Sequence, residues 1–136
     1  MKIILVSHGP FSRGLLESVQ MVLGEQKQIT AHCLMPEETP AALSQRLEAE
    51  IQEAGEDEIL FLTDLYHGSP FNVVVSLMRD YRFYHITGIN LPLLIDAIMS
   101  RNGGMPAQEI CDRLVALAPE TILNVDHLFH EEETEE

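Results

Sequence analysis

The stretch Lys2-Ile3-Ile4-Leu5-Val6-Ser7-His8-Gly9 opens the chain with an apolar run that ends in a histidine and a glycine. A continuous apolar run of this length, closed by a turn residue, is typical of a strand buried on both faces of a parallel sheet. A second run, Ile59–Thr63, leads directly into Asp64. Parallel strands end at the same edge of a sheet, where open α/β proteins place their chemistry. We therefore expect His8 and Asp64 to face each other at that edge.

Strand-like and helix-like segments alternate along the rest of the chain. Short apolar runs predict further strands at residues 29–34 and 83–87, and helical spacing of apolar residues predicts helices at residues 12–23, 40–54, 70–79, 93–99 and 106–117. Strands joined by helices of this length imply right-handed crossovers. We predict an α/β fold, a doubly wound and mainly parallel sheet with helices on both faces.

Several local signals mark the ends and faces of these segments. Ser12 and Thr39 are predicted N-caps, and Glu50 is predicted to face water. Ile122–Val125 predicts a short, antiparallel last strand at the sheet edge, a place for pairing with another subunit. We divide the chain into a domain at residues 1–130 and an acidic, frayed tail at residues 131–136.

The composition is that of one acidic domain of 136 residues, with 22 acidic and 8 basic side chains and a net charge of −14. The basic residues are scattered, which disfavours nucleic acid and favours a basic protein partner. No apolar stretch reaches the roughly 18–20 residues that cross a bilayer, and the start lacks a secretory pattern, so we expect a cytoplasmic protein. Cys33 and Cys111 are expected to be free thiols.

Residues 64–72 supply the polar groups of a candidate site. A carboxylate bonded to one imidazole nitrogen fixes the tautomer, leaves the other nitrogen free as a nucleophile and balances the charge that forms on phosphorylation. Gly68 and Ser69, ahead of a proline-started helix, leave amide donors free for an anion and add a hydroxyl. Singly, His8 fits a structural strand-end histidine, Asp64 a turn residue and Ser69 a helix cap. Their combination predicts a site that takes up and hands on a phosphoryl group.

Four motifs, in order, resemble the mannose-family IIA component of the bacterial phosphoenolpyruvate-dependent sugar phosphotransferase system (PTS). They are Ser7-His8-Gly9, Leu23-Gly24-Glu25, Phe61–Asp64 running into Gly68–Asn72, and Thr87–Leu94. The resemblance covers essentially the whole domain. It implies a phosphotransferase with no cofactor that accepts a phosphoryl group from the phosphocarrier HPr on Nε2 of His8. The resemblance further implies that the protein passes the group to a IIB partner, which phosphorylates a sugar during uptake. The chain would then meet the membrane only through the transporter complex.

The resemblance also implies roles for single residues. Asp64 would bond the imidazole, and Ser69 would hold the phosphoryl group together with the backbone of Gly9 and Gly68. Asn90 would lie in a loop at the same edge as an accessory residue. Family members are homodimers in which the last strand crosses to the other subunit.

Other interpretations stay open. His67 stands where the family usually has glycine, and is either an exposed loop residue or a second imidazole at the site. A histidine phosphatase needs an arginine cluster, whereas Ser7 precedes His8 and only Arg13 is near. A phosphorylation-sensing regulatory module would have the same site, although we expect DNA-binding or ATPase segments in such a protein. A dihydroxyacetone-kinase phosphodonor is disfavoured by the Ser-Pro-Phe-Asn sequence, and a metal site from His8, Asp64 and His67 lacks local ligand spacing.

Overall fold

Four parallel strands form the sheet of this protein. The computed structural model describes the backbone of residues 1–135 and the side chains of residues 1–130. The strands lie in the order β2-β1-β3-β4 and are β1 (Lys2–His8), β2 (Ile29–Leu34), β3 (Ile59–Thr63) and β4 (Tyr84–Thr87). The chain winds from β1 to β2 on one side and then to β3 and β4 on the other, so the switch point lies between β1 and β3. The predicted doubly wound parallel sheet is confirmed.

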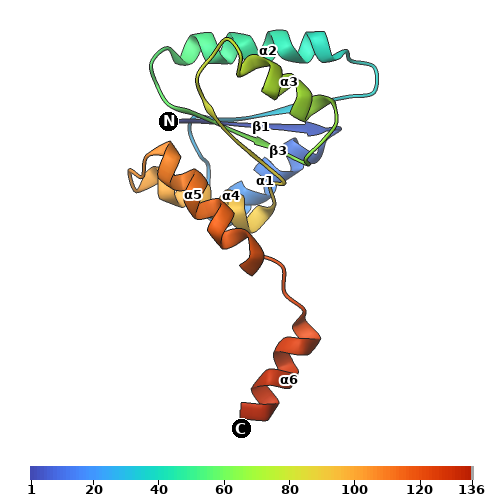
Figure 1. Ribbon diagram of the computed structural model, residues 1–136, viewed down its shortest axis with the longest axis vertical. Helices are drawn as coiled ribbons and strands as arrows, with labels where there is room; N and C mark the ends of the chain where they lie inside the picture. The colour runs from blue at the N-terminus through green and yellow to red at the C-terminus, as the bar shows by residue number, and fades with distance from the viewer. Residues whose placement is uncertain (136) are drawn as a thin grey trace.

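Helices cover both faces of the sheet (Figure 1). One face carries α1 (Phe11–Leu23), α4 (Leu91–Asn102) and α5 (Ala107–Leu117), and the other carries α2 (Pro40–Ala54) and α3 (Ser69–Leu77). A short 3₁₀ turn (Ala118–Glu120) follows α5. None of the helices within residues 1–135 has both the length and the apolar character that a bilayer crossing needs.

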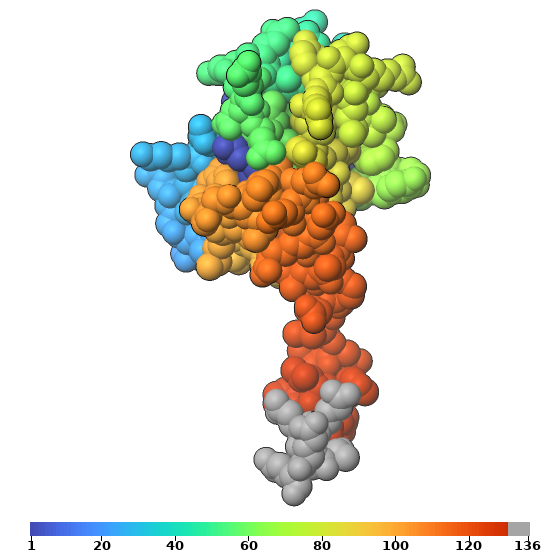
Figure 2. Space-filling model, turned by 60° about the vertical axis from the view of Figure 1, so that its left-hand side comes forward, coloured from blue at the N-terminus to red at the C-terminus, as the bar shows by residue number. Residues whose placement is uncertain are grey.

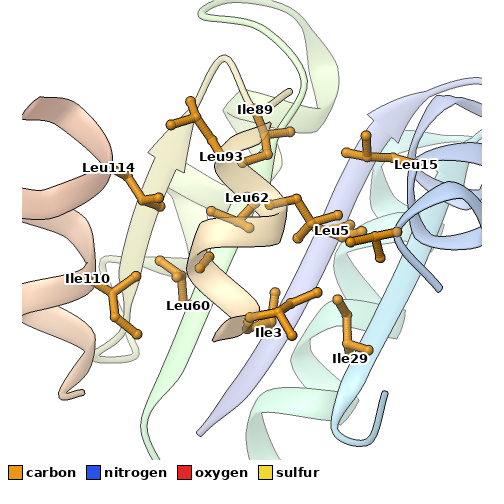
Figure 3. Packing of buried hydrophobic residues seen from close by; sticks show 14 residues of the cluster. Ile3, Leu5, Leu15, Ile29, Leu60, Leu62, Ile89, Leu93, Ile110 and Leu114 are labelled. Carbon is orange, nitrogen blue, oxygen red and sulfur yellow. The ribbon is translucent and has the colours of Figure 1, made fainter. Parts of the chain in front are cut away.

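The two central strands are buried on both sides, which explains why their sequences are apolar without alternation. Leu5 and Leu62 point towards α1, α4 and α5, where they meet residues such as Leu93 and Leu114 (Figure 3). The next residues along the strands, such as Phe61, pack against α2 and α3 instead. The ends of β1 and β3 are thereby held rigidly between two helical layers.

The C-terminal segment differs from the prediction. Within one chain no strand forms at Ile122–Val125, because residues 121–124 are irregular and α6 (Val125–Glu135) begins where the strand was expected to end. Asn124 explains the change, since its Oδ1 accepts the N–H of His127 at 3.2 Å and so caps a helix. The pairing of this segment with a second subunit stays a prediction. The predicted frayed tail is helical through Glu135, and Glu136 lies outside the described residues. Both views show residues 121–130 leaving the body of the molecule (Figures 1 and 2).

Two of the local predictions need correction. Thr39 caps α2 as predicted, by accepting the N–H of Ala42 at 3.1 Å. Ser12, however, lies inside α1, and the N-cap position belongs to Pro10, which makes no side-chain cap bond. The buried Ser12 hydroxyl donates instead to the carbonyl of His32 at 2.9 Å.

Glu50 does not face water, because it lies between α2 and the edge of the sheet. Its carboxylate accepts from Thr30 at 2.9 Å and pairs with Lys2 at 2.9 Å and with His32. Burial raises the pKa of Glu50, but the hydrogen bonds from His32, Lys2 and Thr30 outweigh burial and bring it to about 2. Strand β2 is therefore joined to α2 by a half-buried ionic cluster that an amphipathic pattern alone does not predict.

Candidate active site

His8 and Asp64 meet at the switch point of the sheet. His8 is the last residue of β1, Asp64 follows the last residue of β3, and the register pairs Val6 with Thr63. The prediction that these side chains face each other is confirmed by two hydrogen bonds. Asp64 Oδ2 lies 2.9 Å from the backbone nitrogen of His8 and 2.8 Å from His8 Nδ1.

The carboxylate decides which imidazole nitrogen is free. Because an ionised carboxylate can only accept hydrogen bonds, the proton between the two groups belongs to Nδ1 of His8. The lone pair of the neutral ring is then on Nε2. The Asp64 side chain is only 10% exposed, whereas that of His8 is 47% exposed. The pair thus consists of a sheltered orienting group and a nitrogen that an outside partner can reach.

Gly68 lies directly against the free nitrogen. A Cβ built on it would come within 2.7 Å of both Nε2 and Cε1 of His8, and its φ of +96° is in the region that favours glycine. Any other residue at this position would crowd the ring. The backbone at Gly68 is therefore close enough to place the following residues beside Nε2.

The N-terminus of α3 provides anion donors at this place. The helix begins at Ser69 with Pro70 in its first turn, and no side chain caps it. Within the described residues, the N–H groups of Ser69 and Phe71 and the Ser69 hydroxyl have no hydrogen-bond partner, whereas the N–H of Asn72 is used by the Gly68 carbonyl. Free amides at a helix start favour a negative group such as phosphate.

Gly9 and Asn90 are engaged elsewhere. The Gly9 N–H donates to the carbonyl of Leu34 at 2.8 Å, so this amide is not a free phosphate donor. Asn90 caps α4 by accepting the N–H of Leu93 at 3.0 Å, and its amide nitrogen donates to Thr121 at 3.0 Å. Their contributions to a phosphate site therefore stay predictions, and the geometry shows Gly9 in a turn and Asn90 in a cap.

His67 is an exposed loop residue whose ring meets that of Tyr66 edge-on, with centroids 4.1 Å apart. Among the described residues only Gln28 has a positive φ without being glycine. The backbone at position 67 therefore accepts a histidine without strain. Nor do the described residues bring three metal-ligating side chains together anywhere, so the alternative metal site of His8, Asp64 and His67 is not formed.

Two residues to which the sequence analysis gave no role at the site lie directly behind the pair. Ser7 and Thr63 are fully buried and immediately precede His8 and Asp64. The Thr63 hydroxyl lies 2.8 Å from both Nε2 of His85 and the hydroxyl of Thr87. The sequence signal for these two residues was a serine near the end of β1 and a threonine at the end of β3, both in strands that are otherwise apolar.

His85 is neutral at physiological pH, because burial lowers its pKa to about 4. Its ring also lies 5.4 Å from that of Phe71, centroid to centroid, at the start of α3. The Thr63 carbonyl accepts the N–H groups of Gly88 and Ile89 at 3.0 and 3.1 Å. Strand β4 and the loop after it thus anchor the residue that precedes Asp64.

Comparison with known proteins identifies the family. The model of the family described as "PTS system fructose IIA component" matches residues 2–115. The chain belongs to this IIA family. The resemblance predicted from the four motifs is thereby confirmed, and the chain is a component of the bacterial sugar phosphotransferase system.

Named relatives of this IIA chain have different sugars in their names. It is 33% identical to the PTS system mannose-specific EIIAB component of Escherichia coli over 88% of its own length and 36% of that protein, so it spans about a third of this relative. It is 31% identical to the sorbose-specific EIIA component of Klebsiella pneumoniae, over 85% and 84% of the two chains. The crystal structure of the EIIA component from Streptococcus agalactiae has a TM-score of 0.85 at 29% identity, covering 93% and 98%.

Proposed function

We propose that this IIA protein accepts a phosphoryl group from HPr on Nε2 of His8 and passes it to a histidine of a IIB partner. The receiving IIB component then phosphorylates a sugar as it is taken up. The observation that carries the proposal is the bond between Asp64 and Nδ1 of His8, which leaves Nε2 unprotonated beside the free amides of α3. Family membership supports the same reaction.

The transfer step balances with the groups at the site. The Nε2 lone pair forms a bond to phosphorus while the bond from phosphorus to the donor breaks, and the donor leaves with that electron pair. The phosphorylated ring keeps its proton on Nδ1 and becomes a cation, which the charge of Asp64 stabilises. Transfer to IIB reverses these events, and the lone pair returns to Nε2.

The start of α3 is suited to the phosphoryl oxygens. The Ser69 hydroxyl and the N–H groups of Ser69 and Phe71 are the donors nearest in sequence to Gly68, which lies against Nε2. Amide donors that are already fixed in place stabilise an arriving charged group, because the protein does not have to reorganise around it. They hold the phosphoryl group without covering it, so a second protein can still reach it.

Exposed apolar side chains that follow β1 and β3 support a protein partner at this edge. Phe11, Leu65 and Tyr66 are each about half exposed or more, and follow His8 or Asp64 closely in the chain. Aromatic and apolar side chains of this kind are typical of the buried cores of protein interfaces. The net charge of −14 suits a basic partner, as predicted from the sequence.

A homodimer is part of the proposal. β4 pairs only with β3 among the described strands, which leaves its other edge open. The irregular segment at residues 121–124 exposes Ile122 and Leu123, at 82% and 63%. We propose that this segment lies along β4 of a second copy, where it gains the hydrogen bonds and the burial that it lacks in one chain.

A histidine phosphatase finds no support in the geometry. Its arginine cluster would surround the phosphate, but the residue before His8 is the fully buried Ser7. Within the described residues no arginine forms a hydrogen bond or ion pair with His8, and Arg13 is exposed.

The test is incubation of the protein with phosphoenolpyruvate, enzyme I and HPr, followed by mass spectrometry for an acid-labile phosphate. We expect one phosphate per chain on His8 and none on the His8→Ala variant. Addition of a IIB protein should then remove the label, which separates transport chemistry from a regulatory role that ends at phosphorylation. Stoichiometric labelling of His8→Ala on another histidine would contradict the assignment.

A further inference from the structure

Enclosed hydroxyl groups gather around the residues of the candidate active site. Within the described residues only Ser7, Ser12 and Thr63 are polar side chains classed as buried, and none is more than 2% exposed. A hydroxyl that is removed from water must recover its lost hydrogen bonds inside the protein. The partners that each one finds therefore indicate what it holds in place.

The hydroxyl of Ser7 forms its hydrogen bonds with the turn that contains His8 and with the start of α1. It donates to the carbonyl of Gly9 at 3.1 Å and accepts the backbone N–H of Ser12 at 2.8 Å. The first bond spans His8 itself, from the residue before it to the residue after it. The second joins this turn to the first turn of α1.

The bond to Ser12 replaces an ordinary helix cap. The N-cap position of α1 is Pro10, which makes no side-chain cap bond. Ser7 satisfies one of the amides at the start of α1 from the end of the preceding strand. One hydroxyl therefore connects β1, the turn and α1.

The main chain around His8 is fixed at three points as a result. Its own N–H donates to Asp64 Oδ2 at 2.9 Å, the Gly9 N–H donates to the Leu34 carbonyl at 2.8 Å, and the Gly9 carbonyl accepts from Ser7. Only the last of these bonds depends on a side chain other than that of Asp64. Gly9 has a φ of +55°, a flexible residue type that by itself would leave the turn loosely defined.

We propose that Ser7 is a positioning residue for phosphoryl transfer, whose hydroxyl holds the His8-Gly9 turn so that the ring keeps its bond to Asp64 with Nε2 beside Gly68. This inference rests on the proposed function of His8. The hydrogen bonds of the Ser7 hydroxyl go to the backbone of Gly9 and Ser12, so Ser7 acts on His8 through the backbone. Its loss should therefore slow the transfer step without weakening the encounter with HPr.

Ser12 provides a matched control. Its side chain is as buried as that of Ser7, but its hydroxyl bonds to the carbonyl of His32 and to Cys33 Sγ, away from the turn. Ser12→Ala keeps the backbone N–H that Ser7 accepts. Both variants lose one enclosed hydroxyl, so a purely structural effect should be similar in the two.

The experiment compares the phosphorylation rate at saturating phosphorylated HPr with the HPr concentration that gives half of that rate. For Ser7→Ala we expect the maximal rate to fall at least about tenfold, since small displacements of a reacting group have effects of this size, while the half-saturating concentration stays within about twofold. Ser12→Ala should keep both values. An unchanged maximal rate in Ser7→Ala, or an equal loss in Ser12→Ala, overturns the proposal.

A second measurement does not depend on HPr. Two-bond ¹H–¹⁵N correlation spectra of the full chain report which nitrogen of His8 carries the proton. We expect a dominant Nδ1–H form in the native protein and in Ser12→Ala, and a mixture of tautomers in Ser7→Ala. If the native protein is not phosphorylated but the tautomers differ in this way, the proposed function fails, and what stands is that Ser7 orients the His8 ring.

The Ser7→Cys variant covers the case in which Ser7→Ala does not fold. A thiol has nearly the same shape but is a weak hydrogen-bonding group. We expect it to fold, to transfer more slowly than the native protein and to show the same mixture of tautomers. A folded Ser7→Cys variant with native rates and a native tautomer overturns the proposal.

Discussion

Replacing Gly68 by alanine tests the geometry of the site at a single atom. The new Cβ would lie 2.7 Å from Nε2 of His8, whereas ordinary contact for such an atom begins near 3.4 Å. The ring or the loop must therefore yield by about 0.7 Å. A displacement approaching 1 Å of a reacting group lowers a rate by about 100-fold, and we expect phosphorylation of His8 to slow by one to two orders of magnitude, that is about 10- to 100-fold.

The variant also carries a backbone cost that must be separated from the contact. At the φ of +96° and ψ of 175° of Gly68, a region essentially restricted to glycine, another residue costs about 1–3 kcal/mol of stability. Gly24→Ala is the matched control, because its φ of +84° and ψ of 179° are close to those of Gly68 and its new Cβ would meet no atom within 4 Å. Both variants should lose similar stability in urea unfolding, and only Gly68→Ala should lose transfer rate.

The assay is a time course of labelling by phosphoenolpyruvate, enzyme I and HPr, read by mass spectrometry. The native rate in Gly68→Ala would refute the conclusion that the phosphoryl group enters beside Gly68. An equally slow Gly24→Ala would show that backbone strain, and not crowding of Nε2, causes the loss.

Three further predictions follow from other parts of the structure. Asp64→Asn should keep the fold but slow phosphorylation more than about tenfold, because an amide cannot balance the imidazolium charge; unchanged kinetics would make Asp64 a simple turn residue. The pKa values of His85 and Glu50 are lower in the folded protein than in the unfolded chain, so on acidification the unfolded chain takes up these protons first and the folded state loses stability. This loss should occur first through His85, between pH 6.5 and about 4, and then through Glu50, between pH 4.5 and about 2. Urea unfolding against pH should lose the first step in His85→Gln and the second in Glu50→Gln, which should also cost about 2–3 kcal/mol at pH 7. Light scattering should show a dimer for the full chain and after removal of residues 131–136, but a monomer or aggregates after removal of residues 122–136; a monomeric full chain would refute the exchange.

The fold could be predicted because its determinants are local and repeated. The apolar run of β1 and the run Ile59–Thr63 each name a buried strand, and parallel strands bring their ends together whatever the helices between them look like. This rule alone placed His8 opposite Asp64. The run Ile122–Val125 looked similar, but Asn124 within it caps a helix, and a short apolar run does not by itself distinguish the two structures.

The predicted phosphate donors were harder to assign, because a free amide depends on which neighbours arrive in space. Ser69 follows a glycine and starts a helix, and its amide is free as expected. Gly9 also lies between the end of a strand and the start of a helix, yet its N–H donates to the carbonyl of Leu34 on β2. No property of residues 7–10 reveals that β2 will lie within hydrogen-bond distance.

The N-terminus of α1 shows why the hydrogen bonds of Ser7 could not be predicted from the sequence. A rule based on sequence looks for a capping side chain at the residue before the helix, and Ser12 was the predicted cap. In the structure the amide at the start of α1 is instead satisfied from the preceding strand, by Ser7, the last residue but one of β1, whose hydroxyl accepts the N–H of Ser12. If the turn served only to connect β1 with α1, a cap within the turn would be enough. A buried cap that also bonds to the carbonyl after His8 restricts the one residue whose position the chemistry depends on, and the comparison of Ser7→Ala with Ser12→Ala measures that restriction.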